Sequence, residues 1–219
     1  MQSPREYLRR HPETLRLYAV TDASWLEGRT LDECVLEAVE GGATFVQLRD
    51  KHASTSELVE QYSRLRRVIP GNVPFVVNDD LEAASVAQAD GVHVGQSDAA
   101  CEEARRILGP DKIVGVSVQT VDQALAASEA GADYLGVGAL FKTATKPEAA
   151  DVCLDALLEI CRSVDIPVVA IGGLNEETVA ALEGTGIAGA AVVSALFAAP
   201  DIRLAARGLR DAVNRVCKS

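Results

Sequence analysis

The chain repeats one pattern eight times between Leu17 and Val216: a short apolar run is followed by a stretch with helical spacing. Runs of this length that are apolar throughout are typical of strands buried on both faces of a parallel sheet. Polar residues gather where the runs end. Eight such units predict an α/β fold, a (β/α)8 TIM barrel, with a ligand site on the rim where the strands end. The runs cover residues 17–22, 45–50, 75–79, 91–95, 113–118, 134–138, 167–173 and 189–194.

Capping signals mark the starts of three of the intervening helices. A hydroxyl residue three positions before an acidic or amide residue can form a capping box, in which each side chain accepts a hydrogen bond from the other residue's backbone N–H. The expected boxes pair Thr30 with Glu33, Ser54 with Glu57 and Thr120 with Gln123.

Length and composition indicate one domain. The 219 residues are 48% hydrophobic, and no Pro/Gly/Ser-rich linker divides them, so they can share one core. The first residues include Arg5, Arg9, Arg10 and His11 but no long apolar run, which favours an extension over a signal peptide or membrane span. We expect an N-terminal extension over residues 1–15, a catalytic barrel domain over residues 16–219, and a cytoplasmic protein. A homo-oligomer formed through the outer helices is compatible with the sequence.

Cysteine usage and net charge exclude several functions. The five cysteines are scattered and form no CxxC pair, which favours reduced thiols over disulfides or a zinc site. The net charge of −11 opposes nonspecific attraction to nucleic acid or anionic membranes. We expect neither as a partner, and any phosphate ligand must be held by specific groups.

The loops after the last two runs predict a phosphate site. Gly172 and Gly173 end the seventh run, and Ser194 ends the eighth. In barrels of this type these loops commonly bind phosphate, and glycine lets backbone N–H groups approach an anion closely. The alternative is that the glycines only form a tight turn and that Ser194 only caps the next helix.

Carboxylates after the third and fourth runs predict a metal site. Asp79 ends the third run and Asp98 lies just beyond the fourth, so two neighbouring units present hard oxygen ligands that suit Mg²⁺. Surface aspartates are also common in such loops. Alternation points Asn78 away from Asp79 unless the strand already bends into its loop, and Asp80 is expected to start the next helix.

The second run ends in a polar, cationic segment. Gln47, Arg49 and Lys51 lie on one side of this extended stretch. Two cations and an amide are costly in a dry barrel interior unless an anion or a hydrogen-bonding ligand meets them. The alternative is an ion pair between Arg49 and an aspartate, with Lys51 in solvent.

The loop after the sixth run contains Thr143, Thr145 and Lys146. Two hydroxyls and an ammonium group favour a phosphate clamp. Long loops are also often only mobile.

His93 lies within the fourth run. Because it is flanked by glycines in the middle of a strand, we expect a structural or pocket-lining histidine rather than a proton-transfer group.

Eight short segments resemble the thiamine-phosphate synthase family over nearly the whole span from Leu17 to Ala198. Each is short, but eight in the right order are specific. The segments are Gln-x-Arg-x-Lys at 47–51, Val-Asn-Asp at 77–79, Gly-Val-His-Val-Gly-Gln-Ser-Asp at 91–98, Gly-Val-Ser at 115–117, Gly-Val-Gly at 136–138, Thr-Ala-Thr-Lys at 143–146, Ile-Gly-Gly at 171–173 and Val-Ser at 193–194.

The resemblance implies a transferase that joins a pyrimidinylmethyl diphosphate to a thiazole phosphate, giving thiamine phosphate and pyrophosphate. It implies Mg²⁺ as the cofactor, with Asp79 and Asp98 as its ligands. The positions matched to contacts with the pyrimidine diphosphate are Gln47, Arg49, Lys51, Asn78, Ser117 and Lys146, and the expected catalytic residues among them are Arg49, Lys51, Ser117 and Lys146. The positions matched to the thiazole-phosphate site are Thr143, Thr145, Gly173, Val193 and Ser194.

The loop after the sixth run departs from the family. Family members usually have proline near two positions where this chain has Ala139 and Lys142. Because proline restricts φ, its absence predicts a more mobile loop.

Two other functions remain as alternatives. A thiazole tautomerase-like paralogue would bind a related thiazole phosphate without diphosphate or magnesium machinery, and the presence of Asp79, Asp98, Lys51 and Lys146 argues against it. A non-catalytic sensor of phosphorylated metabolites would use the rim only for binding, but no output domain accompanies the barrel.

Overall fold

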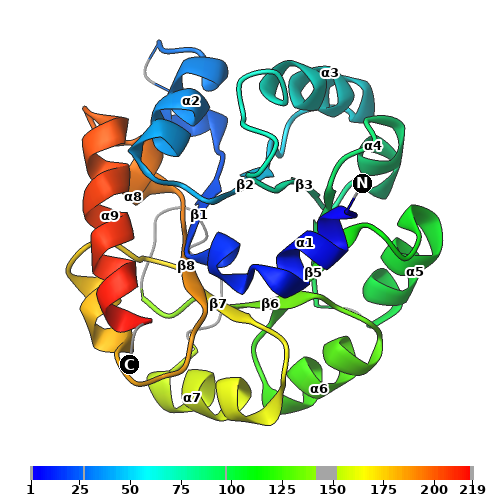
Figure 1. Ribbon diagram of the computed structural model, residues 1–219, viewed down its shortest axis with the longest axis vertical. Coiled ribbons are helices and arrows are strands. Elements are labelled where there is room, and N and C mark those ends of the chain that lie inside the picture. Colours follow the sequence, from blue (N-terminus) through cyan, green and yellow to red (C-terminus); the bar gives the residue numbers. More distant parts are fainter. Residues whose placement is uncertain (1, 27, 97, 142–151, 218–219) are drawn as a thin grey trace.

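Eight parallel strands close into a barrel, as the repeat predicts (Figure 1). The computed structural model describes residues 2–26, 28–96, 98–141 and 152–217, without the side chains of residues 98 and 99. Neighbours in sequence are neighbours in the sheet, and the pairing of β1 with β8 closes it. The strands are β1 (Leu17–Val20), β2 (Phe45–Leu48), β3 (Phe75–Asn78), β4 (Gly91–Val94), β5 (Ile113–Val118), β6 (Tyr134–Val137), β7 (Val168–Ile171) and β8 (Gly189–Val192).

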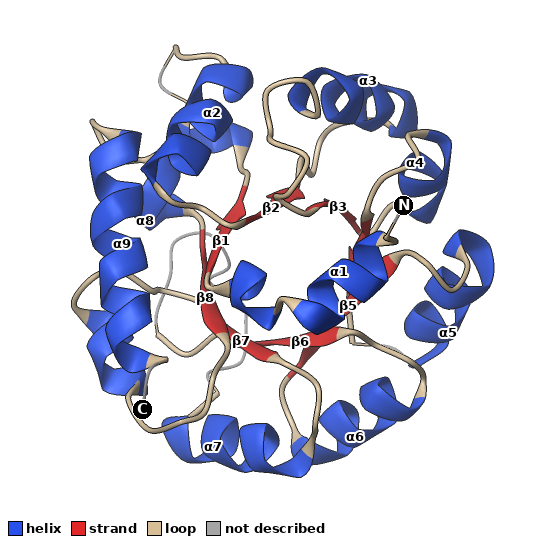
Figure 2. Ribbon diagram, in the orientation of Figure 1, coloured by secondary structure: helices blue, strands red, loops and turns tan. Residues whose placement is uncertain are grey.

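Helices form a ring around the barrel (Figure 2). Between β7 and β8 the described residues form a 3₁₀ helix, η3 (Thr178–Leu182), instead of an α-helix. Gly184 and Gly186 follow it with positive φ, which ends any helical continuation. No helix of the described segments is long and apolar enough to cross a membrane. The ring consists of α2 (Leu31–Gly41), α3 (Thr55–Leu65), α4 (Leu81–Val86), α5 (Asp98–Leu108), α6 (Val121–Glu129), α7 (Leu154–Ser163), α8 (Ser194–Phe197) and α9 (Ile202–Val216).

Two of the three expected capping boxes are complete, at Thr30 before α2 and at Ser54 before α3. At α6 only half of the box forms. The Thr120 hydroxyl accepts from the Gln123 N–H, but the Gln123 carboxamide oxygen accepts from the Gln119 N–H, one residue before the cap. All three helices still begin where their hydroxyl residues predict.

The N-terminal residues close one end of the barrel. The helices α1 (Pro4–Arg10) and η1 (Pro12–Leu15) precede β1, and α1 lies across the barrel opening (Figure 1). Leu8 and Leu15 are completely buried among the side chains that fill the barrel interior. The residues expected as an extension therefore supply part of the interior core, at the end of the barrel where the strands begin.

A buried carboxylate holds α1 in place. Asp133, at the start of β6, accepts hydrogen bonds from Arg5 Nε at 2.7 Å and from Arg105 Nη2 at 2.7 Å. Its Oδ2 also accepts from the backbone N–H of Val114 at 3.0 Å. The Asp133 side chain is fully buried, so these contacts replace its hydration. One carboxylate thus ties α1, α5 and β5 to the turn that leads into β6.

We predict that Asp133→Asn lowers the free energy of unfolding by about 3 kcal/mol, because it leaves two partly buried arginines without their counter-charge. Urea denaturation measures the loss. Glu103→Gln is the control, since the Glu103–Arg106 pair lies in solvent on α5, and its loss should stay below about 0.5 kcal/mol. Equal losses in the two variants would contradict the anchoring role of Asp133.

Candidate functional site

A cavity of about 760 Å³ opens inside the barrel toward the carboxyl ends of the strands. All eight strands contribute to its wall, either directly or through the residue that follows the strand. Every predicted substrate-binding residue whose side chain is described lies in this wall: Gln47, Arg49, Lys51, Asn78, Ser117, Gly173, Val193 and Ser194. These segments, distant in sequence, therefore line one cavity.

The cationic side of the cavity contains an unpaired arginine nitrogen. Arg49 is 7% exposed, and its Nη1 donates to Asp22 Oδ2 at 3.1 Å. Its Nη2 is buried and has no acceptor among the described residues. Lys51 is exposed at the cavity wall. The expected ion pair with an aspartate is present, and it uses only one of the two terminal nitrogens of the guanidinium.

Asp22 is held in its charged form. Partial burial acts to raise the pKa of this carboxyl, but hydrogen bonds from Ser24 and the neighbouring charge of Arg49 outweigh it and keep the pKa below its usual value. An ionised Asp22 fixes the direction of the Arg49 side chain. The free Nη2 is consequently held in a defined position.

The chain bends sharply at the end of β3. Asp79 has a φ of 59°, and its backbone N–H donates to the His93 carbonyl at 2.9 Å. The bend places the Asp79 carboxylate beside Asn78, whose Nδ2 donates to Asp79 Oδ2 at 2.7 Å. Simple alternation would separate these two side chains, so the bend decides their arrangement. Asp80 caps α4 through the Ala83 N–H, as expected.

Of the two proposed metal ligands, the structure describes the side chain of Asp79 but not that of Asp98. Asp79 is exposed at the rim, beside the cavity wall rather than among the residues that form it. Asp98 begins α5, directly after β4, which pairs with β3; its side chain lies outside the described part of the structure. Among the described residues there is no cluster of three or more His, Cys, Asp or Glu side chains that could hold a metal ion.

Glycines bring two rim loops into contact. Gly172 and Gly173 have φ of 102° and 64°, and a Cβ on Gly172 would lie 2.6 Å from the Ala139 Cα. Beyond β6, the N–H groups of Leu140 and Phe141 donate to the carbonyls of residues 171 and 172. The glycines therefore form a tight turn that packs against the loop after β6. Thr143, Thr145 and Lys146, like Lys142, lie outside the described residues.

The end of β8 leads directly into a short helix. Ser194 is the first residue of α8 and is partly exposed in the cavity wall, next to Val193. The first N–H groups of a helix have no intrahelical acceptor. Ser194 and the Gly172–Gly173 turn line the same cavity.

Inside the barrel, polar side chains at the base and walls of the cavity form a continuous chain of hydrogen bonds. Gln47 Nε2 donates to the Tyr18 hydroxyl at 2.6 Å, and the Tyr18 and Tyr134 hydroxyls lie 2.8 Å apart. Tyr134 contacts His93 Nδ1 at 3.0 Å, and His93 Nε2 contacts Ser117 Oγ at 2.9 Å. His93 thus lines the pocket, as expected. Burial raises the pKa of both tyrosines well above the usual value.

Neither Tyr18 nor Tyr134 is predicted from the sequence as part of the site. Each lies in a strand at a position that faces the barrel interior, and a buried tyrosine hydroxyl normally requires a polar partner. That requirement was the available signal, but the sequence alone does not show which partner each hydroxyl reaches.

Residues 17–196 match the family model described as thiamine monophosphate synthase. The thiamine-phosphate synthase of Chloroflexus aurantiacus is 48% identical over 201 residues, which is 91% of this chain and 93% of the relative. That of Ruminiclostridium cellulolyticum is 46% identical over 196 residues, or 89% and 93% of the two chains.

The chain belongs to the thiamine-phosphate synthase family. The solved structure of thiamine phosphate pyrophosphorylase from Pyrococcus furiosus supports the assignment, with a TM-score of 0.84, 40% identity and coverage of 93% of this chain and 98% of that one. The family model begins where β1 begins. The helices α1 and η1 therefore precede residues 17–196, which the family model matches. Their side chains Leu8 and Leu15 nevertheless fill part of the barrel interior.

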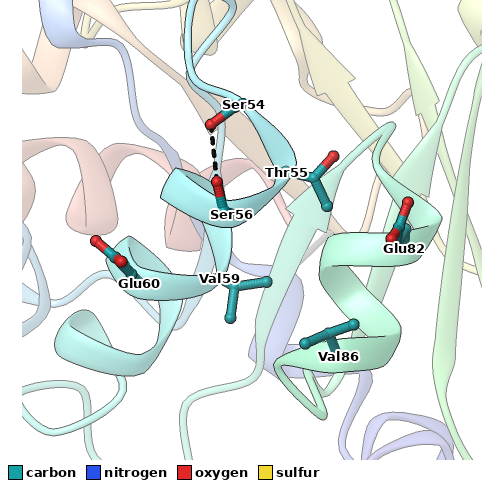
Figure 3. Close-up of a pocket in the computed structure, with 7 residues that line it drawn as sticks. All are labelled: Ser54, Thr55, Ser56, Val59, Glu60, Glu82 and Val86. Carbon is teal, nitrogen blue, oxygen red and sulfur yellow. Dashed lines mark hydrogen bonds between the residues drawn. The ribbon is translucent and has the colours of Figure 1, made fainter.

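A second hollow lies outside the barrel, between α3 and α4 (Figure 3). It is lined by Ser54, Thr55, Ser56, Val59, Glu60, Glu82 and Val86. The only charged side chains in this lining are two glutamates, so it does not suit the phosphorylated ligands expected for the family. The rim cavity is the better candidate site.

We predict that Gly172→Ala lowers the free energy of unfolding by about 2 kcal/mol, because alanine is strained at positive φ and its Cβ would collide with Ala139. Thermal and urea denaturation test this. Gly71→Ala is the control: nothing lies within 4 Å of a Cβ there, and the change should be within about 0.5 kcal/mol. Full stability of Gly172→Ala would show that the two loops do not depend on this contact.

Proposed function

We propose that the rim cavity joins a pyrimidinylmethyl diphosphate to a thiazole phosphate, producing thiamine phosphate and pyrophosphate. The observation that most favours this function is the buried, unpaired Nη2 of Arg49 in the cavity wall. A buried guanidinium nitrogen without an acceptor is costly. A phosphate oxygen would satisfy it, and the family assignment supplies a substrate that carries two phosphates.

The proposed reaction is a dissociative substitution. The C–O bond to the diphosphate breaks, and the diphosphate leaves with the electron pair. The electron-rich aminopyrimidine supports the resulting benzyl-like cation, and the thiazole nitrogen then donates its lone pair to form the C–N bond. No protein nucleophile is needed, so the protein acts by positioning the substrates and by stabilising charge.

Residues of the cavity wall have distinct proposed roles. Arg49 and Lys51 stabilise the negative charge that accumulates on the leaving diphosphate, and Lys146 has the same proposed role. Gln47, Asn78 and Ser117 orient the pyrimidine substrate through hydrogen bonds. Gly173, Val193 and Ser194, with Thr143 and Thr145, hold the thiazole phosphate.

The residues at the ends of β3 and β4 fit Mg²⁺ as the cofactor. Asn78 hydrogen-bonds one oxygen of the exposed Asp79 carboxylate, which leaves the other oxygen for a ligand. Asp98 follows the neighbouring strand. Magnesium is commonly bound by one or two carboxylates, with waters and substrate phosphates completing the shell. When bound, it would neutralise charge on the diphosphate.

The first experiment is to incubate the purified chain with both substrates, with and without Mg²⁺, and to measure thiamine phosphate. Magnesium-dependent product supports the proposal. If the folded protein forms no product, isomerisation of the thiazole phosphate distinguishes the two alternatives. Isomerisation would indicate a tautomerase-like enzyme, and binding without any turnover would indicate a sensor.

We predict that Asp79→Ala and Asp98→Ala each lower kcat by roughly a hundredfold and weaken its dependence on Mg²⁺, because each removes a hard oxygen ligand. Initial rates across a magnesium titration measure both effects. Asp165→Ala is the control, since Asp165 is exposed in the turn before β7, at the opposite end of the barrel. Unchanged kinetics in folded Asp79 and Asp98 variants would remove the metal assignment.

We predict that Ser194→Ala raises the KM for the thiazole phosphate by about tenfold, which is the loss expected for one hydrogen bond to a charged group. The KM for the pyrimidine diphosphate should change little and serves as the internal control. Steady-state kinetics with each substrate varied in turn separates the two constants. An unaltered constant for the thiazole phosphate would reject this role for Ser194.

A further inference from the structure

The hydrogen-bond chain from Gln47 to Ser117 connects two walls of the cavity through the barrel interior. Its ends lie on β2 and β5, and it passes through β1, β6 and β4. The two tyrosines in its middle are 2% and 0% exposed, and Tyr18 borders the cavity. Each tyrosine hydroxyl is bonded to two side chains, and no further partner exists for either among the described residues.

The surrounding strands leave space for this chain. A Cβ on Gly115 would lie 2.1 Å from Tyr134 Cζ and 2.4 Å from its hydroxyl oxygen. A Cβ on Gly136 would lie 3.1 Å from His93 Cε1. Two glycines on neighbouring strands thus accommodate the two rings, because a larger side chain at Gly115 would occupy the position of the Tyr134 ring.

The orientation of the Gln47 amide assigns one direction to the hydrogen-bond chain, because each hydroxyl carries a single proton. Gln47 Nε2 donates to Tyr18, so the Tyr18 proton is directed to Tyr134. Tyr134 then accepts from Tyr18 and donates its own proton to His93 Nδ1. A neutral imidazole has one protonated nitrogen, which leaves the proton on Nε2. In this direction His93 Nε2 donates to Ser117 Oγ, which lies 2.9 Å away.

We infer that Tyr18 and Tyr134 are positioning residues that fix the Nε2–H tautomer of His93 and thereby make Ser117 a hydrogen-bond donor toward the cavity. Ser117 Oγ accepts a hydrogen bond from His93 Nε2, so the Ser117 hydroxyl can donate its own hydrogen bond to a ligand. This inference rests on the proposed function in one respect, namely that Ser117 contacts the pyrimidine substrate. The group it meets there is an acceptor, a ring nitrogen or a phosphate oxygen.

The hydrogen bonds from Gln47 to Ser117 can also run in the opposite direction, which is a distinct state of the same side chains. If the Gln47 amide turned over, its oxygen would accept from Tyr18, and all four bonds would reverse. His93 would then carry its proton on Nδ1, and the Ser117 hydroxyl would donate its hydrogen bond to His93 Nε2. Ser117 would offer the ligand only an acceptor. The two states therefore differ in an observable property, the tautomer of one histidine.

The direct test is ¹⁵N NMR of the full chain, without substrates, at about pH 8, where an ordinary imidazole is neutral. The sequence has three histidines, and His11→Gln with His52→Gln leaves His93 as the single imidazole. We expect a protonated Nε2 and an unprotonated Nδ1. A protonated Nδ1 would overturn the inference, and this readout does not depend on any enzymatic activity.

Tyr134→Phe should relax the tautomer to a mixture, because it removes the donor to Nδ1. Tyr62→Phe is the matched control. Tyr62 is also a buried tyrosine, and its hydroxyl donates to the Phe75 carbonyl, apart from the chain. We expect His93 to keep its Nε2–H tautomer in the control. An unchanged tautomer in Tyr134→Phe would show that Tyr134 does not direct His93.

A double-mutant cycle tests the route through Ser117. Tyr134→Phe should lower kcat by roughly three- to tenfold and leave the KM for the thiazole phosphate unchanged. In a Ser117→Ala background, Tyr134→Phe should have no further effect on kcat, since the group through which it acts is gone. Additive losses would reject the positioning role. If the wild type forms no thiamine phosphate, the proposed function fails while the NMR result still decides the polarity of the chain.

Discussion

Closure of the sheet is the constraint on which the rest of this structure depends. Pairing of β1 with β8 leaves no free strand edge, and it forces the carboxyl ends of all eight strands into one ring. Residues as far apart in sequence as Gln47 and Ser194 consequently line the same cavity. Closure also creates an interior that must be filled. Large side chains, among them Phe45 and Ile113, fill it together with Leu8 and Leu15 from the N-terminal helices.

The interior changes character along the barrel axis. At the end where the strands begin, α1 and η1 cover the core with apolar side chains. Toward the other end, the hydroxyls of Tyr18 and Tyr134 and the imidazole of His93 replace hydrocarbon with a connected polar chain. Because the end where the strands begin is closed, solvent can approach these polar groups only through the cavity. A ligand in the cavity therefore meets side chains whose other hydrogen bonds are already made.

The sequence predicted what depends on local pattern and on ring closure. Strand positions follow from apolar runs, helix starts from hydroxyl caps, and the shared cavity from the (β/α)8 architecture. It could not predict features set by contacts between distant segments. The bend at Asp79 places its carboxylate beside Asn78, and strand alternation gives no sign of it. Similarly, the polar partners of Tyr18 and the burial of Leu8 depend on strands or helices far along the chain. At α6 the Gln123 side chain accepts from the Gln119 N–H, whereas the expected capping box requires the N–H of Thr120, the next residue.

The attachment of α1 to Asp133 has a consequence for how the chain is made. Arg5 and Asp133 are separated by 128 residues, so α1 leaves the ribosome long before its anchor exists. At a synthesis rate of about 5–20 residues per second, the first helix waits roughly 6 to 25 seconds for its binding partner. During this interval Leu8 has no barrel interior to enter. The segment that closes the barrel is therefore translated well before the residue that anchors it.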